Sequence, residues 1–502
     1  MEATIWSILP PVITIFLALL TKEVYISLLV GIFTGALLFT QGDFIESITT
    51  SFGIMGDKVG SNANIMVFLV ILGCIVAAIN RSGATKAYAE WASSKIRSAR
   101  SASVMTSLLG LIIFIDDYFN CLTVGTVMRP ITDKFKVARV KLAYIIDATA
   151  APICIIAPIS SWAAAVTSSM PEGSTIDGFQ LFLHTIPFNF YAILTIIFLY
   201  FTIISKRDIF TMAHHINKYE PENVPDSLRD NKDYDPNGNG GVMDLILPLA
   251  VLIAGCIFGM LYTGGIMEGK SVADAFADCD SSSGLVIGSF TAFLFTALLY
   301  IPRGVISFHS FCETFAQGFK AMAPANMILC FAWTLSGICG ADYLNLGGYV
   351  GGIVSENTGI IAVLPALFFI VAALLSFATG TSWGTFGILI PIACAAVGMD
   401  IELLTICVAA CLSGAVSGDH ASPISDTTIL ASAGGGCNHI DHVETQLPYV
   451  MIVVTVSLIG FLVAGVLGNP YLGLLAALAI MALVLATIYI KVKPQENIEL
   501  QQ

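Results

Sequence analysis

Two adjacent aspartates interrupt a stretch that is otherwise apolar. Asp116 and Asp117 are preceded and followed by about twelve mostly apolar residues each, within the segment 104–130. A carboxylate near the middle of a bilayer costs roughly 3 kcal/mol on insertion scales, and neighbouring carboxylates repel each other. The pair therefore favours binding of a proton or a cation, either of which neutralises the same oxygen atoms. The alternative is that an aspartate only caps a half-helix and does not titrate.

Neutral oxygen ligands follow this pair and recur in a second interrupted segment, 360–399. Na⁺ binds carboxylate, hydroxyl and carbonyl oxygens, including carbonyls that are freed where a membrane helix unwinds. Asn120 follows the acid pair, and hydroxyl groups gather in the second segment at Thr379, Thr381, Ser382 and Thr385. We predict that these side chains belong to one site that binds an ion or a substrate.

A third polar cluster interrupts the apolar segment 401–430. Pro423 breaks the helix there because it lacks a backbone donor. Acids and hydroxyl groups surround this break at Asp419, Ser422, Ser425, Asp426 and Thr427. We predict that they join the same site, where Na⁺ would be held by Asp116, Asp117, Asn120 and Asp426. His420 is a candidate pH sensor, and the alternative for the whole cluster is a polar loop at the cytoplasmic mouth.

A fourth break contributes Ser160 and Ser161 to the predicted site. It follows an apolar run that carries one further acid, Asp147. The sequence leaves open whether this acid faces the first interrupted segment or pairs with Lys141 or Arg129. A transport role and a structural pairing are both compatible with the pattern.

The overall composition is that of a membrane protein. Of the 502 residues, 56% are hydrophobic and only 11% are charged, with a net charge of −13, whereas a soluble protein has about 25% charged residues. So little polar surface rules out a soluble enzyme, a disordered chain and a nucleic-acid binder. The 12 cysteines form no CxxC pair, so we expect neither a metal cluster nor a disulfide framework. The expected partners are the lipid bilayer and the transported ions, with no cofactor besides Na⁺ as coupling ion.

The apolar stretches predict an all-α polytopic protein. A helix needs roughly 20 residues to cross a bilayer, and uninterrupted candidates lie at 6–21, 24–40, 64–80, 181–204, 243–263, 284–301, 325–341, 447–468 and 470–490. Basic residues cluster at 81–100, at 129–141, in the linker 205–241 and at the C-terminus, and such clusters face the cytoplasm. Segment 104–130 then starts and ends on one side. Each of its arms spans about 18 Å, which predicts a re-entrant hairpin.

The two halves of the chain resemble each other. Residues 63–66 match 325–328, and 157–161 match 422–426 at a spacing of 265. We predict a first repeat at 1–204, the cytoplasmic linker 205–241, an inverted second repeat at 242–468, and an extra C-terminal helix with its tail at 469–502. Each repeat contains a hairpin (104–130 and 360–399) and a broken helix (142–170 and 401–430). The total is about 11 transmembrane helices and two re-entrant hairpins, an architecture typical of secondary transporters.

Three motifs carry a family resemblance: FIDDYFN at 114–120, TGTSWGT at 379–385 and GDHASPISDTT at 418–428. Together they resemble the NhaC-type sodium/proton antiporter family, and the likeness extends from about residue 10 to 465. The resemblance implies two inverted repeats, an elevator mechanism, a homodimer and the bacterial inner membrane. It implies Na⁺(Li⁺)/H⁺ antiport on midplane carboxylates. The sequence has neither HExxH nor a GxGD-type protease pair, so we expect no enzymatic activity.

The substrate stays open between two kinds of transporter. Related members are described as exchanging malate for lactate or as carrying amino acids, so the alternative is a Na⁺- or H⁺-coupled carrier of a small organic acid or amino acid. Neither hairpin tip has an Arg or Lys, which a dicarboxylate site usually needs, although helix N-termini also bind carboxylates. Trp162 and Trp383 either stack on an organic substrate or pack in the core.

Overall fold

The computed structural model describes residues 3–21, 23–171, 177–217, 238–346, 348–349, 358–398 and 400–494. These residues form helices and no strand, which confirms the all-α prediction. Six of the helices are long and apolar enough to cross a membrane: α4 (Ala63–Ser82), α14 (Val242–Thr263), α16 (Ser281–Tyr300), α22 (Ile401–Ala421), α24 (His439–Leu467) and α25 (Pro470–Lys491). The chain is therefore a multi-pass membrane protein.

Bent helix pairs raise the number of candidate spans in the described residues to nine. Helices α2 (Val24–Phe39) and α3 (Phe44–Ser61) meet at 120°. Helices α11 (Gly178–Thr185) and α12 (Phe190–Ser205) belong to a pair bent by 43°, and α17 (Phe308–Cys339) bends by 42° near Pro324. Length and composition thus identify six to nine spans, and the eleven crossings stay a prediction.

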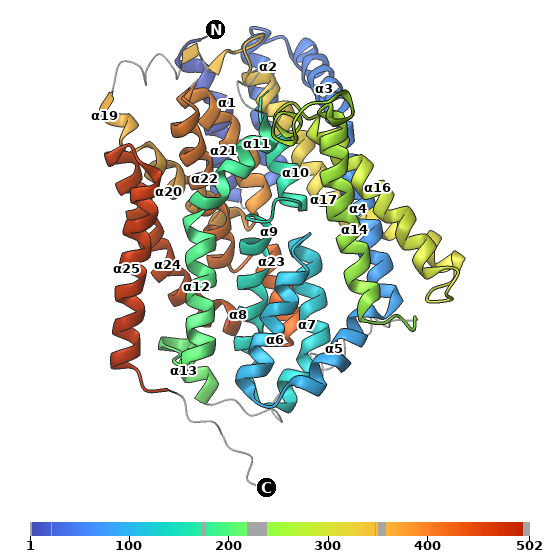
Figure 1. The fold of residues 1–502 in the computed structure, drawn as a ribbon. Helices are drawn as coiled ribbons and strands as arrows, with labels where there is room; N and C mark the ends of the chain where they lie inside the picture. Colours follow the sequence, from blue (N-terminus) through green and yellow to red (C-terminus); the bar gives the residue numbers. More distant parts are fainter. Residues whose placement is uncertain are drawn as a thin grey trace.

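Two helix pairs correspond to the interrupted segments 104–130 and 360–399. The first consists of α6 (Ala99–Ile112) and α7 (Asp117–Lys134), and the second of α20 (Leu364–Thr379) and α21 (Ser382–Val397). These helices have 14 to 18 residues and extend only about 21–27 Å. The first pair lies in the lower half of the molecule and the second in the upper half (Figure 1). Their breaks consequently meet near the middle.

Two further helices are broken near the middle of the molecule, close to the breaks of the two helix pairs (Figure 1). Helices α8 (Arg139–Thr149), α9 (Ala151–Cys154) and α10 (Ser161–Ser168) replace the predicted helix 142–170, and α23 (Asp426–Gly435) continues α22 after a break. The expectation of a single break in the first of these was too simple, because the backbone also turns at Ala150 (φ −88°, ψ −98°). The described chain around each main break contains a proline, Pro158 or Pro423, which supplies no backbone donor.

Helix α22 is the buried centre of this arrangement. In its apolar window 83% of the residues are buried, against 22% in the outer helix α25. Two glycines let α20 approach closely, because a Cβ at Gly414 would lie 2.4 Å from the Phe369 carbonyl oxygen. A Cβ at Gly418 would lie 2.2 Å from that of Ala373. The close packing fixes the end of α22, which carries Asp419 and His420.

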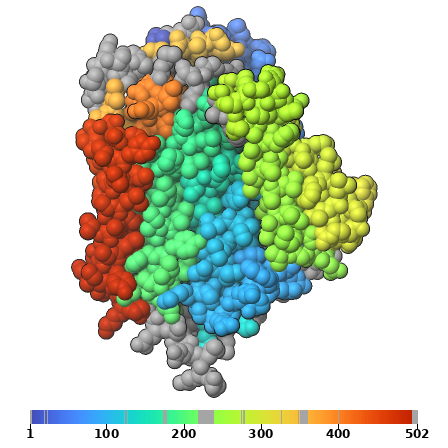
Figure 2. Space-filling model, viewed as in Figure 1, coloured from blue at the N-terminus to red at the C-terminus, as the bar shows by residue number. Residues whose placement is uncertain are grey.

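The remaining helices complete the periphery. Figure 2 shows α25 and α16 on opposite flanks of the molecule. The other elements are η1 (Ile5–Ile8), α1 (Leu9–Thr21), α5 (Ala84–Lys95), α13 (Phe210–Asn217), η2 (Ile186–Phe188), η5 (Ile266–Glu268), α15 (Val272–Ala277) and α19 (Thr358–Ile361). Helices α5 and α13 and the last turn of α25 lie at one end (Figure 1). Most of the predicted cytoplasmic linker, 218–237, lies outside the described residues.

Candidate functional site

Each hairpin tip is hydrogen-bonded to the start of a broken helix. The Ser161 backbone N–H, at the beginning of α10, donates to the Ile115 carbonyl at the tip between α6 and α7 (2.8 Å). The Asp426 N–H, at the beginning of α23, donates to the Gly380 carbonyl at the tip between α20 and α21 (3.3 Å). Both donor and acceptor are shifted by 265 residues between the two bonds. Helix ends are thus paired in the same way in both halves of the chain.

Four helix N-termini carry predicted site residues as caps. The side-chain oxygens of the capping residues accept backbone N–H bonds at distances of 3.0 to 3.4 Å in α7, α10, α21 and α23. The caps are Asp116, Ser160, Thr381 and Ser425. N-terminal helix ends carry partial positive charge that stabilises nearby anions. Asp116 thus caps α7, and capping does not account for the acids beside it.

Three of the predicted acids are buried and interact across the two halves. Asp116, Asp117 and Asp419 are 1–2% exposed, and Asp117 interacts electrostatically with both of the others. Asp419 Oδ2 accepts hydrogen bonds from the hydroxyls of Ser382 (3.0 Å) and Thr427 (3.1 Å). Asp419 Oδ1 has no partner among the described residues. We call these three acids and the hydroxyls of Ser382 and Thr427 the carboxylate cluster.

Asp426 differs from the other acids in its surroundings. Its side chain is exposed and accepts a hydrogen bond from the Tyr118 hydroxyl (3.2 Å). It therefore lies at the edge of the carboxylate cluster, where the sequence alone offered no way to rank it below Asp419. Within the described part of the chain, none of these four acids forms an ion pair with Lys or Arg.

Asn120 ties the first hairpin tip to α8. Its amide nitrogen donates to the carbonyls of Gly110 (2.8 Å), Ile113 (2.9 Å) and Thr149 (3.0 Å). Its Oδ1 atom is buried and has no hydrogen-bond partner in the described residues. The side chain thus holds the tip in place and leaves one oxygen free. The buried Ser161 hydroxyl lies next to the Asp116 carboxylate.

Four other predicted residues bond to the backbone instead of to the acids. The hydroxyls of Thr379, Thr385 and Ser160 donate to backbone carbonyls at 2.8 to 2.9 Å. The Ser422 hydroxyl accepts a bond from the Ile424 N–H (3.3 Å). These side chains shape the two breaks, and their hydrogen bonds do not join them to the carboxylate cluster.

Trp162 and Trp383 pack against each other beside the carboxylate cluster. Their ring centroids are 6.1 Å apart, both side chains are buried, and Trp162 lies next to Asp117. The Trp162 indole interacts with the Asp117 carboxylate, whereas the Trp383 indole nitrogen has no hydrogen-bond partner among the described residues. The two rings pack in the core, and one buried donor remains available beside the acids.

Asp147 lies in a second polar cluster that the sequence did not reveal. Its Oδ2 atom accepts from Gln446 Nε2 (2.6 Å) and from the Thr428 hydroxyl (3.2 Å) and lies 3.4 Å from His442 Nε2. Its Oδ1 atom lies 3.7 Å from His420 Nε2. The signal for the two new residues is weak, since His442 and Gln446 are four residues apart and share only a helix face.

The suggested pairing of Asp147 with Lys141 is wrong. The ammonium group of Lys141 binds Asp208 (2.6 Å) and the Thr202 hydroxyl (2.8 Å). Tyr449 also donates to Asp208 (2.7 Å), so the pair is enclosed by its own partners. The reason lies in the direction of the side chains, because Lys141 and Asp147 are six residues apart and lie on different sides of α8.

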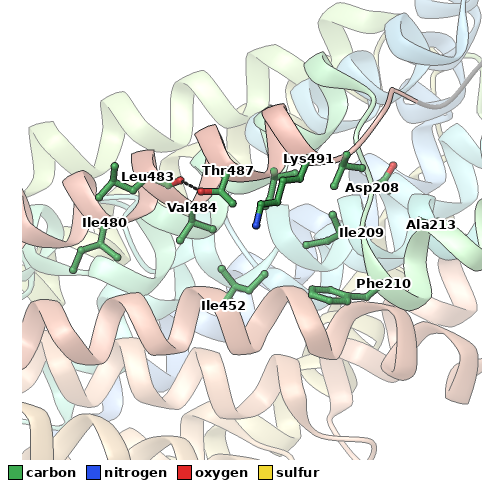
Figure 3. Close-up of a pocket in the computed structure, with 12 residues that line it drawn as sticks. Asp208, Ile209, Phe210, Ala213, Ile452, Ile480, Leu483, Val484, Thr487 and Lys491 are labelled. Atoms are coloured by element: carbon green, nitrogen blue, oxygen red, sulfur yellow. Dashed lines mark hydrogen bonds between the residues drawn. The ribbon is translucent and has the colours of Figure 1, made fainter.

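A pocket of about 640 Å³ lies away from both clusters, between α13, α24 and α25 (Figure 3). Its wall is mainly apolar and includes Ile209, Ile452 and Leu483, with Asp208 and Lys491 at one end. None of the predicted ion-binding residues lines it. The described residues also contain no group of three or more His, Cys, Asp or Glu side chains arranged to hold a metal ion. A bound Na⁺ would thus need hydroxyl, amide or carbonyl oxygens besides carboxylates.

The chain matches a known protein family over more than half of its residues. It also matches one relative over nearly its full length. The model of the Na⁺/H⁺ antiporter family matches residues 164–466. An uncharacterized protein of Haemophilus influenzae is 40% identical over 485 residues, which cover 92% of this chain and 91% of that protein.

Relatives with a named activity match shorter stretches. The malate-2H⁺/Na⁺-lactate antiporter of Bacillus subtilis is 35% identical over 23% of this chain and 27% of its own. The arginine/ornithine antiporter ArcD of Halobacterium salinarum is 40% identical over 22% of this chain and 24% of its own. The family match covers more than half of the chain, and so the chain belongs to the Na⁺/H⁺ antiporter family.

Proposed function

We propose that this antiporter exchanges Na⁺ or Li⁺ for H⁺ at the carboxylate cluster. The observation that carries the proposal is the burial of Asp116, Asp117 and Asp419 together, without an ion pair to Lys or Arg in the described residues. Buried carboxylates without a basic partner are costly. A bound proton or cation removes that cost, so the cluster favours being occupied by one or the other.

The supply of oxygen atoms supports Na⁺ as the cation. We propose that two of the carboxylates of Asp116, Asp117 and Asp419 bind the ion at a time, together with the free Oδ1 atom of Asn120. Asp419 replaces the exposed Asp426 in this set. Ser382 and Thr427 hold Asp419 Oδ2 in position and leave its Oδ1 atom for the ion. A hard cation of this kind prefers oxygen ligands. Protonation of the same carboxylates removes the negative charge that attracts Na⁺, which makes the two ions compete.

The proposed transport cycle uses two inverted repeats. The shift of 265 residues between the Ser161–Ile115 and Asp426–Gly380 bonds supports the repeat, as do the hairpins that approach from opposite ends (Figure 1). Such repeats suit alternating access around a midplane site. We further propose the predicted repeat boundaries, eleven crossings, elevator movement, a homodimer and location in a bacterial inner membrane.

Ion flux in proteoliposomes tests the proposal. The Asp117→Asn variant should lose Na⁺-dependent proton flux, because an amide carries no charge to exchange. Asp278→Asn is the matched control, since Asp278 is exposed and pairs with Lys270 (2.8 Å) outside the cluster. Wild-type flux in Asp117→Asn would refute the role of the cluster. Loss of flux in both variants would point to a defect in reconstitution, which size-exclusion profiles and melting temperatures identify.

A coupled carrier of an organic substrate is the second candidate. The unpartnered indole donor of Trp383, which packs against Trp162 beside the cluster, favours it, as do the names of the malate/lactate and arginine/ornithine relatives. An organic acid or amino acid should then raise the melting temperature in detergent at constant Na⁺. A response only to Na⁺, Li⁺ and pH would exclude this candidate.

A further inference from the structure

A second group of buried ionisable side chains lies beside the carboxylate cluster. Asp147, His420 and His442 are 0–2% exposed and come from α8, α22 and α24. Gln446 and Thr428 complete the group by hydrogen bonds to Asp147 Oδ2. We call these five residues the histidine cluster. The proposed ion exchange at the carboxylate cluster does not use it.

One imidazole nitrogen of the histidine cluster has no partner. His442 Nδ1 forms no hydrogen bond within the described residues, whereas His442 Nε2 and His420 Nε2 face the Asp147 carboxylate at 3.4 and 3.7 Å. Buried polar atoms are normally hydrogen-bonded. The exception here is an imidazole nitrogen, which binds a proton through its lone pair.

The charged and titratable neighbours come from several helices. The Tyr191 hydroxyl of α12 lies 3.1 Å from His420 Nδ1. Tyr144 of α8, Cys121 of α7 and Asp419 of α22 interact electrostatically with Asp147. No Lys or Arg in the described residues forms an ion pair with Asp147. The carboxylate charge is thus faced by two imidazoles that can each take up a proton.

We propose that His442, in the histidine cluster, is a second proton-binding site, which holds a proton exchanged for the cation. The inference rests on the proposed function and adds that one proton is carried outside the cation ligands. With both imidazoles neutral, the cluster has a charge of −1 from Asp147, and one proton on His442, whose Nε2 atom lies 3.4 Å from Asp147 Oδ2, makes it neutral. The proton adds to a nitrogen lone pair and returns to water when it leaves. Na⁺ is a poor competitor for these nitrogens, because it prefers oxygen.

One hydrogen bond and the chain itself connect the histidine cluster with the carboxylate cluster. The Thr428 hydroxyl lies 3.2 Å from Asp147 Oδ2 and 3.4 Å from the Asp419 carbonyl oxygen. His420 follows Asp419 directly in α22, and within the histidine cluster Gln446 Nε2 donates to both Asp147 Oδ2 and the His420 carbonyl (2.9 Å). A proton on the histidine cluster therefore makes the potential at Asp419 more positive and weakens Na⁺ binding there. Na⁺ binding promotes release of the proton by the same coupling.

Proton release on Na⁺ binding tests this inference. NaCl is added to the purified protein in weakly buffered detergent, and the protons released are measured by a pH indicator and compared with the Na⁺ bound by calorimetry. We expect His442→Gln to bind Na⁺ and to release about one proton fewer per Na⁺ than the wild type. His309→Gln is the matched control, because His309 is 87% exposed.

The outcomes separate the inference from the proposed function. Unchanged proton release in folded His442→Gln, with Na⁺ affinity as in the wild type, overturns the inference and leaves the proposed exchange intact. Absence of Na⁺ binding in the wild type overturns both. If His442→Gln does not fold, Asp147→Asn decides by the same measurement, because it removes the negative charge that faces His442. Folding is checked by melting temperature, and KCl replaces NaCl to remove effects of ionic strength.

Discussion

Two buried aspartates in neighbouring positions have different surroundings. Asp419 contacts the hydroxyls of Ser382 and Thr427 and interacts with further acids. Asp147 contacts an amide and one hydroxyl and is faced by two imidazoles. Both are at most 2% exposed. The chemistry of the neighbours, rather than the depth of the carboxylate, therefore decides whether a cation or a proton is the better occupant.

The two clusters also couple Na⁺ and H⁺ in different ways. A cation and a proton that compete for the same carboxylates exclude each other directly, whereas a proton on the histidine cluster excludes Na⁺ by its charge alone. The two clusters lie at the end of one helix, α22, through the adjacent residues Asp419 and His420. A change that affects only one cluster should therefore separate ion binding from proton release.

The largest expected effect comes from neutralising each aspartate in turn. Asp419→Asn should abolish saturable Na⁺ binding, because it removes a proposed ligand charge. Asp147→Asn should leave Na⁺ binding and reduce the number of protons released per ion. Calorimetry combined with a pH indicator measures both quantities. Equal losses in both variants would contradict the division into two clusters.

The next effect tests whether α22 holds both clusters in place. In Gly418→Ala the new Cβ would lie 2.2 Å from the Ala373 carbonyl oxygen, which α20 cannot relieve without moving. Overpacking of this kind costs typically 1–3 kcal/mol. We expect a lower melting temperature together with weaker Na⁺ binding and altered proton release. Gly53→Ala in α3 is the control, because a new Cβ there would meet no atom within 4 Å, and it should leave both readouts unchanged. Gly398→Ala would be a poor control, because its φ of 68° is a backbone conformation that side chains disfavour.

A smaller effect is expected from Ser382→Ala. The variant removes one of two hydroxyls that hold Asp419 Oδ2, and a lost hydrogen bond costs about 1 kcal/mol, or roughly a fivefold increase in the Kd for Na⁺. Thr385→Ala is the control, because that hydroxyl donates to a backbone carbonyl (2.9 Å). An unchanged Kd in Ser382→Ala would remove this hydroxyl from the site.

The smallest effect is expected from Tyr191→Phe. This change removes the hydroxyl next to His420 Nδ1 (3.1 Å) and retains the ring. The number of protons released per Na⁺ should change by less than in His442→Gln, with an unchanged Kd for Na⁺. A change in the Kd alone would show that Tyr191 acts on the carboxylate cluster instead.

Sequence reasoning located the breaks because they place polar residues inside apolar segments. The positions around Asp116, Thr381 and Asp426 needed only local signals such as proline, hydroxyl groups and adjacent acids. The prediction could not rank Asp419 above Asp426, because one is buried and the other exposed through the packing of distant helices. It also missed His442 and Gln446, whose contacts with Asp147 join residues almost 300 positions apart.

Binding of Na⁺ to Asp117→Asn at several pH values is the most direct test of the central claim. Calorimetric titration of the wild type with NaCl should give saturable binding that weakens as the pH falls, because protons compete for the carboxylates. The Asp117→Asn variant should give no saturable binding at any of these pH values, while its melting temperature shows that it is folded. Na⁺ binding by Asp117→Asn with the affinity and pH dependence of the wild type would contradict the account.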